Sequence, residues 1–91
     1  MNTVSFETLK KLKNPIIVDI RDNYSYNISH IKNSINIPYY NILNNYSHYL
    51  NKNNTYYLYC DEGIQSYEIS TRLNLFGYNT KSLEGGFKSI K

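Results

Sequence analysis

Three short runs of apolar and β-branched residues along this chain are typical of β-strands. They cover residues 15–20 (PIIVDI), 34–38 (SINIP) and 55–60 (TYYLYC), and residues 79–83 (NTKSL) are interpreted as a final strand. In the first run the apolar residues are consecutive rather than alternating, which indicates a strand buried on both faces. Pro38 is expected to stop the second strand, because proline cannot donate a backbone hydrogen bond to a neighbour.

Between these runs the apolar residues follow a helical period. Residues 65–76 predict the clearest helix, with an apolar face formed by Ile69, Leu73 and Phe76. Gly77 follows directly and is suited to end that helix in a left-handed conformation. Residues 39–50 predict a second helix, whose apolar face comprises Ile42, Leu43, Tyr46, Tyr49 and Leu50.

The N-terminal part of the chain is expected to begin with a short helix. Ser5 can cap it, and Pro15 ends it. Residues 21–31 carry turn-forming residues and a broken helical pattern. Because strands alternate with helices and no hairpin dipeptide joins the apolar runs, the sequence predicts one α/β domain over residues 1–91, with a parallel sheet covered by helices.

Composition narrows the range of partners. Apolar residues make up 41% of the chain, and the net charge of +3 comes from scattered basic residues. The only basic run, within residues 10–13, is too short to predict nucleic-acid binding. A single cysteine cannot form an internal disulfide, and no apolar run has the length of a signal peptide or membrane span. We therefore expect a cytoplasmic protein, monomeric by default, with neither nucleic acid nor membrane as a partner.

The single cysteine, Cys60, lies where the third predicted strand ends and a helix is about to begin. Ligands of parallel sheets bind beyond the carboxyl ends of strands, and helix N-termini stabilise anions such as a nucleophilic thiolate. Gly63 favours this interpretation, because glycine lets the backbone approach a ligand. Asp61 and Glu62 oppose it, because carboxylates destabilise a thiolate. Free cysteines also serve as small core residues, so both a reactive and a structural thiol remain open.

Other chemistry has little support. His30 and His48 have no second ligand at a metal-binding spacing, so no metal is predicted. No phosphate-binding or dinucleotide-binding glycine motif occurs, and no cofactor is expected. His30 could meet Cys60 only through the fold, and a role in a turn is favoured over a Cys–His pair.

Three segments, 16–38, 57–66 and 78–87, together resemble the rhodanese-like domain in its single-domain form. They contain a strand ending in D-x-R (Asp19 and Arg21), the stretch HIKNSINIP from His30, the loop CDEGIQS from Cys60, and the closing sequence LEGG. The match covers nearly the whole chain in order. It implies a parallel sheet of about five strands flanked by helices on both faces.

The resemblance also implies an activity. Members of this family are sulfurtransferases: the cysteine, here Cys60, takes a sulfane sulfur from thiosulfate or a persulfide donor, holds it as a persulfide, and passes it to a thiol or to cyanide. The implied partner is a small sulfur donor or a persulfide-bearing protein. Asp19, Arg21 and His30 would support the structure. The substrate-binding loop would consist of Asp61, Glu62, Gly63, Ile64, Gln65 and Ser66, with Ser66 holding the loop and the backbone N–H groups surrounding the sulfur.

Several departures from the family pattern shape these expectations. Active members often have basic residues directly after the cysteine and before the serine, where this chain has Asp61 and Gln65. Carboxylates near the entrance should repel the thiosulfate dianion by about 1 kcal/mol each, so weak thiosulfate use is expected. A non-catalytic regulatory or protein-binding module is the alternative. A phosphatase of the related branch is disfavoured, because its longer loop ends in an arginine that this loop lacks.

Overall fold

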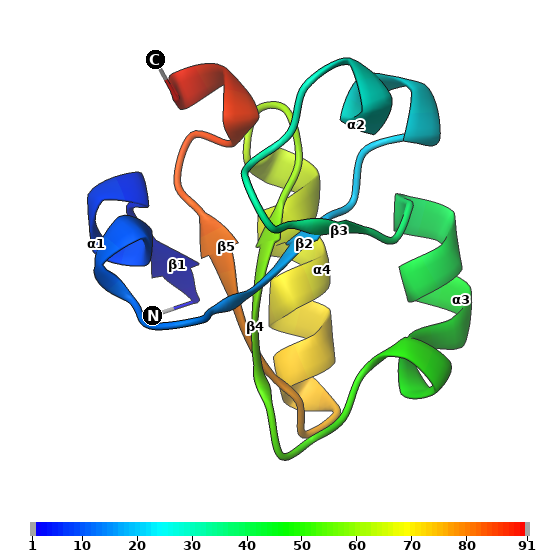
Figure 1. Cartoon of the computed structure of the whole chain (residues 1–91). Helices are drawn as coiled ribbons and strands as arrows, with labels where there is room; N and C mark the ends of the chain where they lie inside the picture. Colours follow the sequence, from blue (N-terminus) through cyan, green and yellow to red (C-terminus); the bar gives the residue numbers. More distant parts are fainter. Residues whose placement is uncertain (1, 91) are drawn as a thin grey trace.

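Five parallel strands form the centre of the computed structural model, which describes residues 2–90 (Figure 1). Their spatial order is β1-β5-β4-β2-β3, and every neighbouring pair is parallel. This confirms the predicted α/β class and the number of strands implied by the family resemblance. The strands are β1 (Thr3–Val4), β2 (Ile16–Asp19), β3 (Ile35–Asn36), β4 (Thr55–Tyr59) and β5 (Asn79–Leu83).

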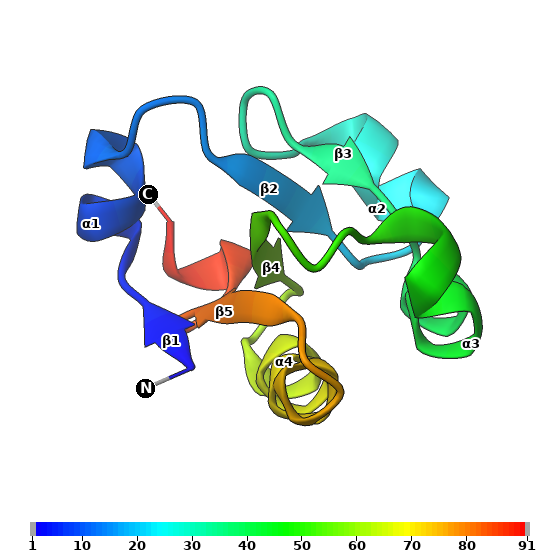
Figure 2. The same ribbon diagram turned by 90° about the horizontal axis from the view of Figure 1, so that it is seen from below.

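Helices cover both faces of this sheet. Figure 2 shows α3 and α4 on one face, and α1 with the short 3₁₀ helix η1 on the other. The helices are α1 (Phe6–Lys11), α2 (Asn23–Ile28), α3 (Tyr39–Tyr49), α4 (Ile64–Leu75) and η1 (Phe87–Ser89). Among the described residues, none of these helices has the length and apolar character needed to cross a membrane.

Two hydrophobic clusters hold the layers together, one on each face of the sheet. Val18 and Leu58 point into the larger cluster, which α3 and α4 close with Ile42, Ile69 and Leu73. Their neighbours in sequence, Ile17 and Tyr59, point into the smaller cluster beneath α1 and η1. Because successive side chains of a strand face opposite sides, β2 and β4 are buried on both faces. For β2 the consecutive apolar run predicted this.

Local capping accounts for the two short N-terminal helices. The Ser5 Oγ accepts a hydrogen bond from Thr8 N at 3.1 Å, which confirms the predicted cap of α1. Asp22 caps α2 in the same way, accepting from Ser25 N at 2.7 Å. This backbone hydrogen bond lowers the pKa of the exposed Asp22 carboxyl. The broken apolar pattern of residues 21–31 hid α2, because the cap and not an amphipathic face marks where it begins.

Some boundaries differ from the prediction. β1 was not expected from the sequence pattern, and β3 is only two residues long. The helix over 39–49 is interrupted at Asn45, which has a non-helical φ of −138° and ψ of 35°. Phe76 lies outside α4 and is 47% exposed, stacking on Tyr46 rather than entering the core.

Helix α4 meets β5 partly through hydroxyl groups. Ser66 and Ser82 lie 2.6 Å apart, and Ser70 and Thr80 form a second pair at 2.6 Å. All four side chains are buried. These pairs satisfy the polar groups of the interface and place α4, and with it the turn that precedes it, against β5.

Candidate active site

Cys60 lies directly after β4, at the edge of the sheet where parallel strands present their carboxyl ends. The turn that follows brings two backbone amides to its sulfur. Gly63 N lies 3.1 Å and Ser66 N 3.4 Å from Cys60 Sγ, and both donate hydrogen bonds to it. Gly63 adopts a left-handed φ of 92° at the cap of α4, which any other residue would adopt only with strain. The turn is therefore shaped to aim N–H donors at the sulfur.

Ser66 holds this turn in place from the first turn of α4. Its hydroxyl lies 2.6 Å from Ser82 Oγ and donates to Gly63 O at 3.4 Å. The Cys60 thiol donates to the same Ser66 Oγ at 3.5 Å. Ser66 is fully buried, so it can position the loop and contact the sulfur without meeting solvent. The family resemblance implied a loop-holding role for Ser66, and these are the contacts that such a role would use.

An open hollow of about 550 Å³ is lined in part by Cys60. Cys60 itself is only 5% exposed and belongs to the larger hydrophobic cluster, so little of this residue faces the hollow. Three carboxylates line the hollow, Asp22, Asp61 and Glu62. Its other lining residues are Ile20, Arg21, Pro38, Tyr39, Tyr40, Asn41, Ile64 and Gln65. Its mouth therefore combines negative charge with exposed aromatic and aliphatic side chains.

Arg21 joins three segments around the site. Its guanidinium binds the buried Asp19 carboxylate, with Nη2 2.7 Å from Oδ2, and donates to Ser29 O at 2.6 Å. Its Nη1 also lies 3.5 Å from Asp61 Oδ1 in the Cys60 loop. Although burial disfavours the charged guanidinium, the hydrogen bonds and charge of Asp19 raise the pKa of Arg21 above its ordinary value. Arg21 is thus a permanent cation that ties the end of β2 to the loop.

The segment after β5 packs onto the other side of the Cys60 loop. Phe87 N donates to Cys60 O at 2.8 Å, and Lys88 N donates to Asp61 O at 2.9 Å. A Cβ on Gly86 would lie 2.5 Å from Asp61 O and 2.6 Å from Gly63 N, so only glycine fits there. The LEGG motif contributed to the family resemblance, but no role was predicted for it. Its two adjacent glycines could have indicated this contact, because paired glycines are typical of positions where two backbone segments approach closely.

His30 lies apart from this site. Its ring stacks on Tyr26 with a centroid separation of 3.8 Å, and its Nδ1 lies 2.7 Å from Tyr26 O. It therefore supports the turn after α2 and lines a different hollow. Within residues 2–90, no three histidine, cysteine, aspartate or glutamate side chains gather as metal ligands would.

The structure brings the predicted loop residues together, although in different roles. Gly63 and Ser66 contact the sulfur, whereas Asp61, Glu62, Ile64 and Gln65 line the hollow above it. Tyr59 was not singled out by the sequence. Its buried hydroxyl accepts from Ile31 N at 3.0 Å and lies 3.3 Å from Ser34 Oγ, and burial raises the pKa of Tyr59 to about 12.

Comparison with known proteins identifies the fold family. A family model described as the rhodanese-like domain matches residues 5–91. Two solved structures superpose closely: a rhodanese-related protein from Thermoplasma volcanium (TM-score 0.88, 26% identity, 98% of this chain and 89% of that chain) and SSP1007 from Staphylococcus saprophyticus (TM-score 0.87, 27% identity, 100% and 94%). The chain belongs to the rhodanese-like domain family.

The curated relatives include two kinds of protein named as sulfurtransferases and one named as a hydroxylase. Thiosulfate sulfurtransferase GlpE of Coxiella burnetii is 33% identical over 88 residues, which cover 96% of this chain and 80% of that protein. The tRNA uridine(34) hydroxylase of Buchnera aphidicola subsp. Baizongia pistaciae is 30% identical over 81% of this chain, and the tRNA sulfurtransferase of Thermoplasma acidophilum is 36% identical over 67%. The chain spans only 26% and 12% of the lengths of these last two relatives.

Proposed function

We propose that this chain is a sulfurtransferase domain in which Cys60 carries a sulfane sulfur as a persulfide. The observation that carries the proposal is the pair of backbone amides, from Gly63 and Ser66, that converge on the sulfur of Cys60, a residue that lines an open hollow. Membership of the rhodanese-like family and the relatives named as sulfurtransferases support the same class of reaction.

The proposed reaction consists of two displacements at sulfur. The Cys60 thiolate attacks the outer sulfur of the donor, a new S–S bond forms, and the donor leaves with the electrons of its own broken S–S bond. An acceptor thiolate then attacks the outer sulfur of the Cys60 persulfide, and Cys60 leaves as a thiolate. No external oxidant is consumed. Because negative charge stays on sulfur throughout, preorganised N–H donors stabilise each state of the cycle.

Charge at the hollow favours a donor of low negative charge. Asp22, Asp61 and Glu62 line the entrance, whereas Arg21, the basic residue among the lining, is already bound by Asp19. Two of these carboxylates have cationic neighbours: Asp61 lies 3.5 Å from Arg21, and Glu62 lies 3.4 Å from Lys88. These ion pairs reduce the negative potential without reversing it. Thiosulfate, a dianion, should therefore load Cys60 less readily than a persulfide.

The side chains around the mouth favour a protein as the donor or acceptor. Tyr40 is 71% exposed and Ile64 is 64% exposed, and both line the hollow together with Tyr39. Exposed apolar and aromatic side chains of this kind gain most from burial against a second macromolecule. A small inorganic anion would not use them. We therefore infer that a persulfide carried by a protein with a neutral or basic surface is the natural partner.

Mass spectrometry of the intact protein tests the proposal. Incubation with a low-charge persulfide, such as cysteine persulfide, should add the mass of one sulfur atom to the wild type and none to Cys60→Ser. The added mass should disappear on treatment with a thiol acceptor, which receives the sulfur. If the wild type gains no sulfur from thiosulfate or from any persulfide, Cys60 is not a sulfur carrier.

The role of the acidic mouth can be tested separately. The pair Asp61→Asn/Glu62→Gln should raise the rate of loading from thiosulfate by about fivefold for each charge removed, since each is worth about 1 kcal/mol. The matched control, Glu7→Gln/Glu68→Gln, changes the net charge equally at positions outside the hollow. An equal gain in the control would show that net charge and not the mouth sets the donor preference.

The acidic mouth also favours a second candidate function, a protein-binding module whose thiol is inert. Asp61 and Glu62 are exposed and precede the helix by only a few residues, where they oppose a negative charge on Cys60. In that case the wild type should resist every sulfur donor and react with iodoacetamide no faster than a buried, unassisted thiol. Sulfur loading of the wild type would exclude this alternative.

A further inference from the structure

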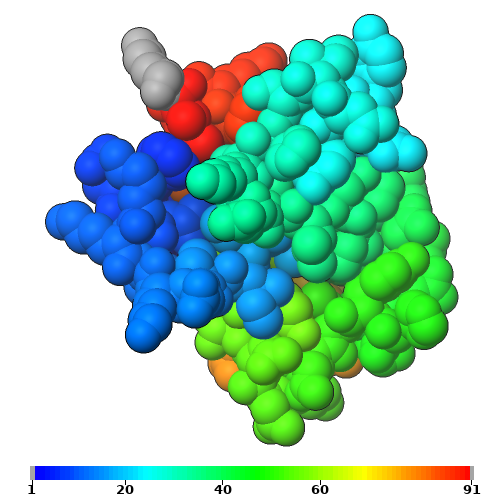
Figure 3. Space-filling view, in the orientation of Figure 1, coloured from blue at the N-terminus to red at the C-terminus, as the bar shows by residue number. Residues whose placement is uncertain are grey.

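A larger hollow than the one at Cys60 lies between α1 and the loop that follows α2. Its volume is about 840 Å³. Figure 3 shows this side of the molecule, where the blue N-terminal residues and the teal segment around residue 30 meet along a crevice. Neither Cys60 nor any residue of its loop lines this groove, so the proposed reaction makes no use of it. The lining residues are Phe6, Leu9, Lys10, Leu12, Asn14, Pro15, Ile17, Ser29, His30, Ile31, Lys32, Asn33, Phe87 and Ile90.

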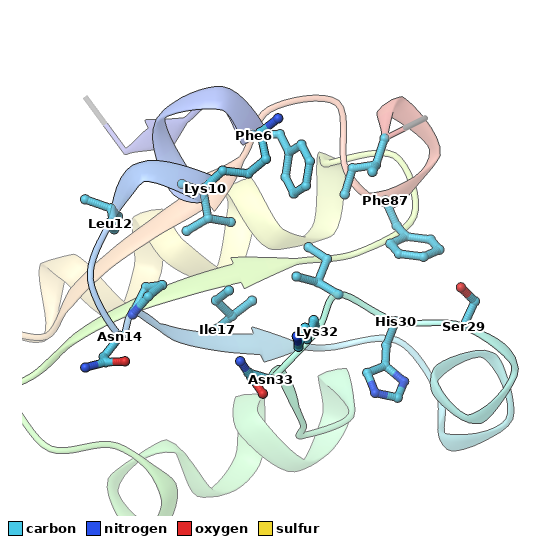
Figure 4. Close-up of a pocket in the computed structure, with 14 residues that line it drawn as sticks. Phe6, Lys10, Leu12, Asn14, Ile17, Ser29, His30, Lys32, Asn33 and Phe87 are labelled. Carbon is cyan, nitrogen blue, oxygen red and sulfur yellow. The ribbon is translucent and has the colours of Figure 1, made fainter.

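The base of the groove is hydrocarbon. Leu9 and Ile17 belong to the smaller hydrophobic cluster, against which the partly buried Phe6, Ile31 and Phe87 pack. Figure 4 shows how these walls come from different parts of the chain, with Phe6 and Lys10 on α1, Ile17 on β2 and Phe87 in η1. A concave apolar surface of this kind gains free energy when another apolar surface covers it.

The rim of the groove is positive. Lys10 and Lys32 line it from opposite walls, and none of the described lining residues is acidic. The Lys10 side chain is 51% exposed, with its Nζ 5.2 Å from the centroid of the Phe6 ring and 3.2 Å from Glu7 Oε2. Lys11 and Lys13 are exposed next to it. The short basic run of the sequence therefore borders this groove, whereas the hollow at Cys60 is bordered by carboxylates.

We propose that this groove binds an acidic, amphipathic segment of a partner protein, with apolar side chains on the hydrocarbon base and carboxylates toward Lys10 and Lys32. An amphipathic helix placed in a hydrophobic groove matches these two features together. Charge complementarity selects an acidic segment over a basic one. Two rim lysines over a hydrocarbon base are too few for the phosphate backbone of a nucleic acid, which needs a continuous basic surface.

The groove adjoins the Cys60 loop through one residue. Phe87 lines the groove, its ring lies 4.3 Å from the Arg21 guanidinium carbon, and its backbone N–H donates to Cys60 O. A segment bound in the groove would therefore rest beside the loop without covering the hollow above the sulfur. The inference concerns binding alone and does not depend on sulfur transfer by Cys60.

Two synthetic helical peptides of about four turns provide the test. Both carry the same leucine face and a single tryptophan; one has glutamates and the other has lysines on the opposite face. Because this chain contains no tryptophan, the fluorescence of the peptide alone reports binding. Amide chemical shifts of the labelled protein then locate the bound peptide. We expect the acidic peptide to bind at the groove, more weakly as salt is raised, and the basic peptide to bind far less.

Charge-reversal variants give the matched comparison. Lys10→Glu/Lys32→Glu should weaken binding of the acidic peptide by about tenfold, as two surface ion pairs become repulsive. Lys52→Glu/Arg72→Glu changes the net charge equally outside the groove and should bind as the wild type does. Should the first pair fail to fold, Lys10→Gln/Lys32→Gln is expected to weaken binding by about threefold. Leu12→Ser, at the groove edge, should also weaken it.

Several results would overturn the proposal. One is the absence of saturable binding of the acidic peptide; another is equal weakening in both charge-reversal pairs. Shift changes outside the groove would also contradict it. So would preferential occupation of the groove by RNA, by vesicles containing anionic phospholipid, or by a second copy of this chain at rising protein concentration.

Discussion

Replacing Gly86 by alanine should disturb the Cys60 loop from the opposite side. Gly86 has a φ of 66° and a ψ of −168°, a conformation that alanine adopts only with strain. The added Cβ would lie 2.5 Å from Asp61 O and 2.6 Å from Gly63 N. These are backbone atoms of the loop, so they cannot rotate away as a flexible side chain could. The loop must therefore move, and with it the Gly63 N–H that donates to the Cys60 sulfur.

The expected cost has two parts. The left-handed backbone conformation contributes about 1–3 kcal/mol, and the steric overlap contributes about 1–3 kcal/mol. The sum, about 4 kcal/mol, is large beside a total stability on the order of 5–14 kcal/mol for a chain of this size. Gly77→Ala is the matched control. Gly77 has a φ of 97°, but the nearest atoms to a Cβ there belong to the flexible Lys52 side chain, at 3.5 Å and beyond. It carries the conformational cost without the overlap.

Urea unfolding and sulfur loading measure the two effects separately. Both variants should unfold at lower urea than the wild type, with Gly86→Ala the less stable by about 2 kcal/mol. Under conditions where each remains folded, Gly77→Ala should load sulfur at the wild-type rate, whereas Gly86→Ala should load slowly. Equal stability of the two variants, or undiminished loading in Gly86→Ala, would refute the reasoning that Gly86 shapes the Cys60 loop.

Three further predictions concern buried polar groups. Ser66→Ala and Ser70→Ala should each lower the free energy of unfolding in urea by about 1–2 kcal/mol, but only Ser66→Ala should slow sulfur loading. Equal loading rates of the two variants would contradict the role of the Ser66 hydroxyl at the sulfur. Arg21→Met leaves the Asp19 carboxylate buried without its partner and should lower the free energy of unfolding by about 3–5 kcal/mol. Adding Asp19→Asn should restore part of this stability, and no recovery would count against the explanation. Because burial raises the pKa of Tyr59 from 10.0 to about 12, the folded state retains the phenolic proton more tightly. This stabilising contribution is fully present at pH values below the pKa of the unfolded state and is lost as the pH rises toward 12. The urea midpoint of the wild type should therefore fall between pH 10 and 12, and that of Tyr59→Phe should fall less.

The apolar pattern predicted the strands and the long helices because those elements are defined by burial. It located β2, β4 and β5 to within about one or two residues, and α4 likewise. It missed β1 and α2, since β1 pairs only at an edge and α2 depends on the Asp22 cap. It wrongly placed Phe76 on the buried face of α4. Ser66 and Ser70 occupy part of that face and contact β5 through their hydroxyls, so the buried face is not a regular apolar stripe.

For the candidate site, the sequence pointed to the thiol and its loop, while contacts between distant segments supplied the rest. The position of Cys60 after a strand and the family motif singled out residues 60–66 before any geometry was known. The catalytic role of Cys60 stays a prediction that the loading experiment decides. The contact of Gly86 with Asp61 and the packing of Phe87 on Arg21 join residues far apart in sequence, and no local pattern contains them.

By itself, the sequence determined the class of fold, the family and the position of the one thiol, because hydrophobic period, motif spacing and a single cysteine are all local features of the chain. Tertiary structure decided which amides face the sulfur, how the carboxylates at the mouth are paired, and that a basic apolar groove lies beside the loop. Those properties depend on distances between segments that only chain folding brings together, and pairing, burial and charge all act through such distances.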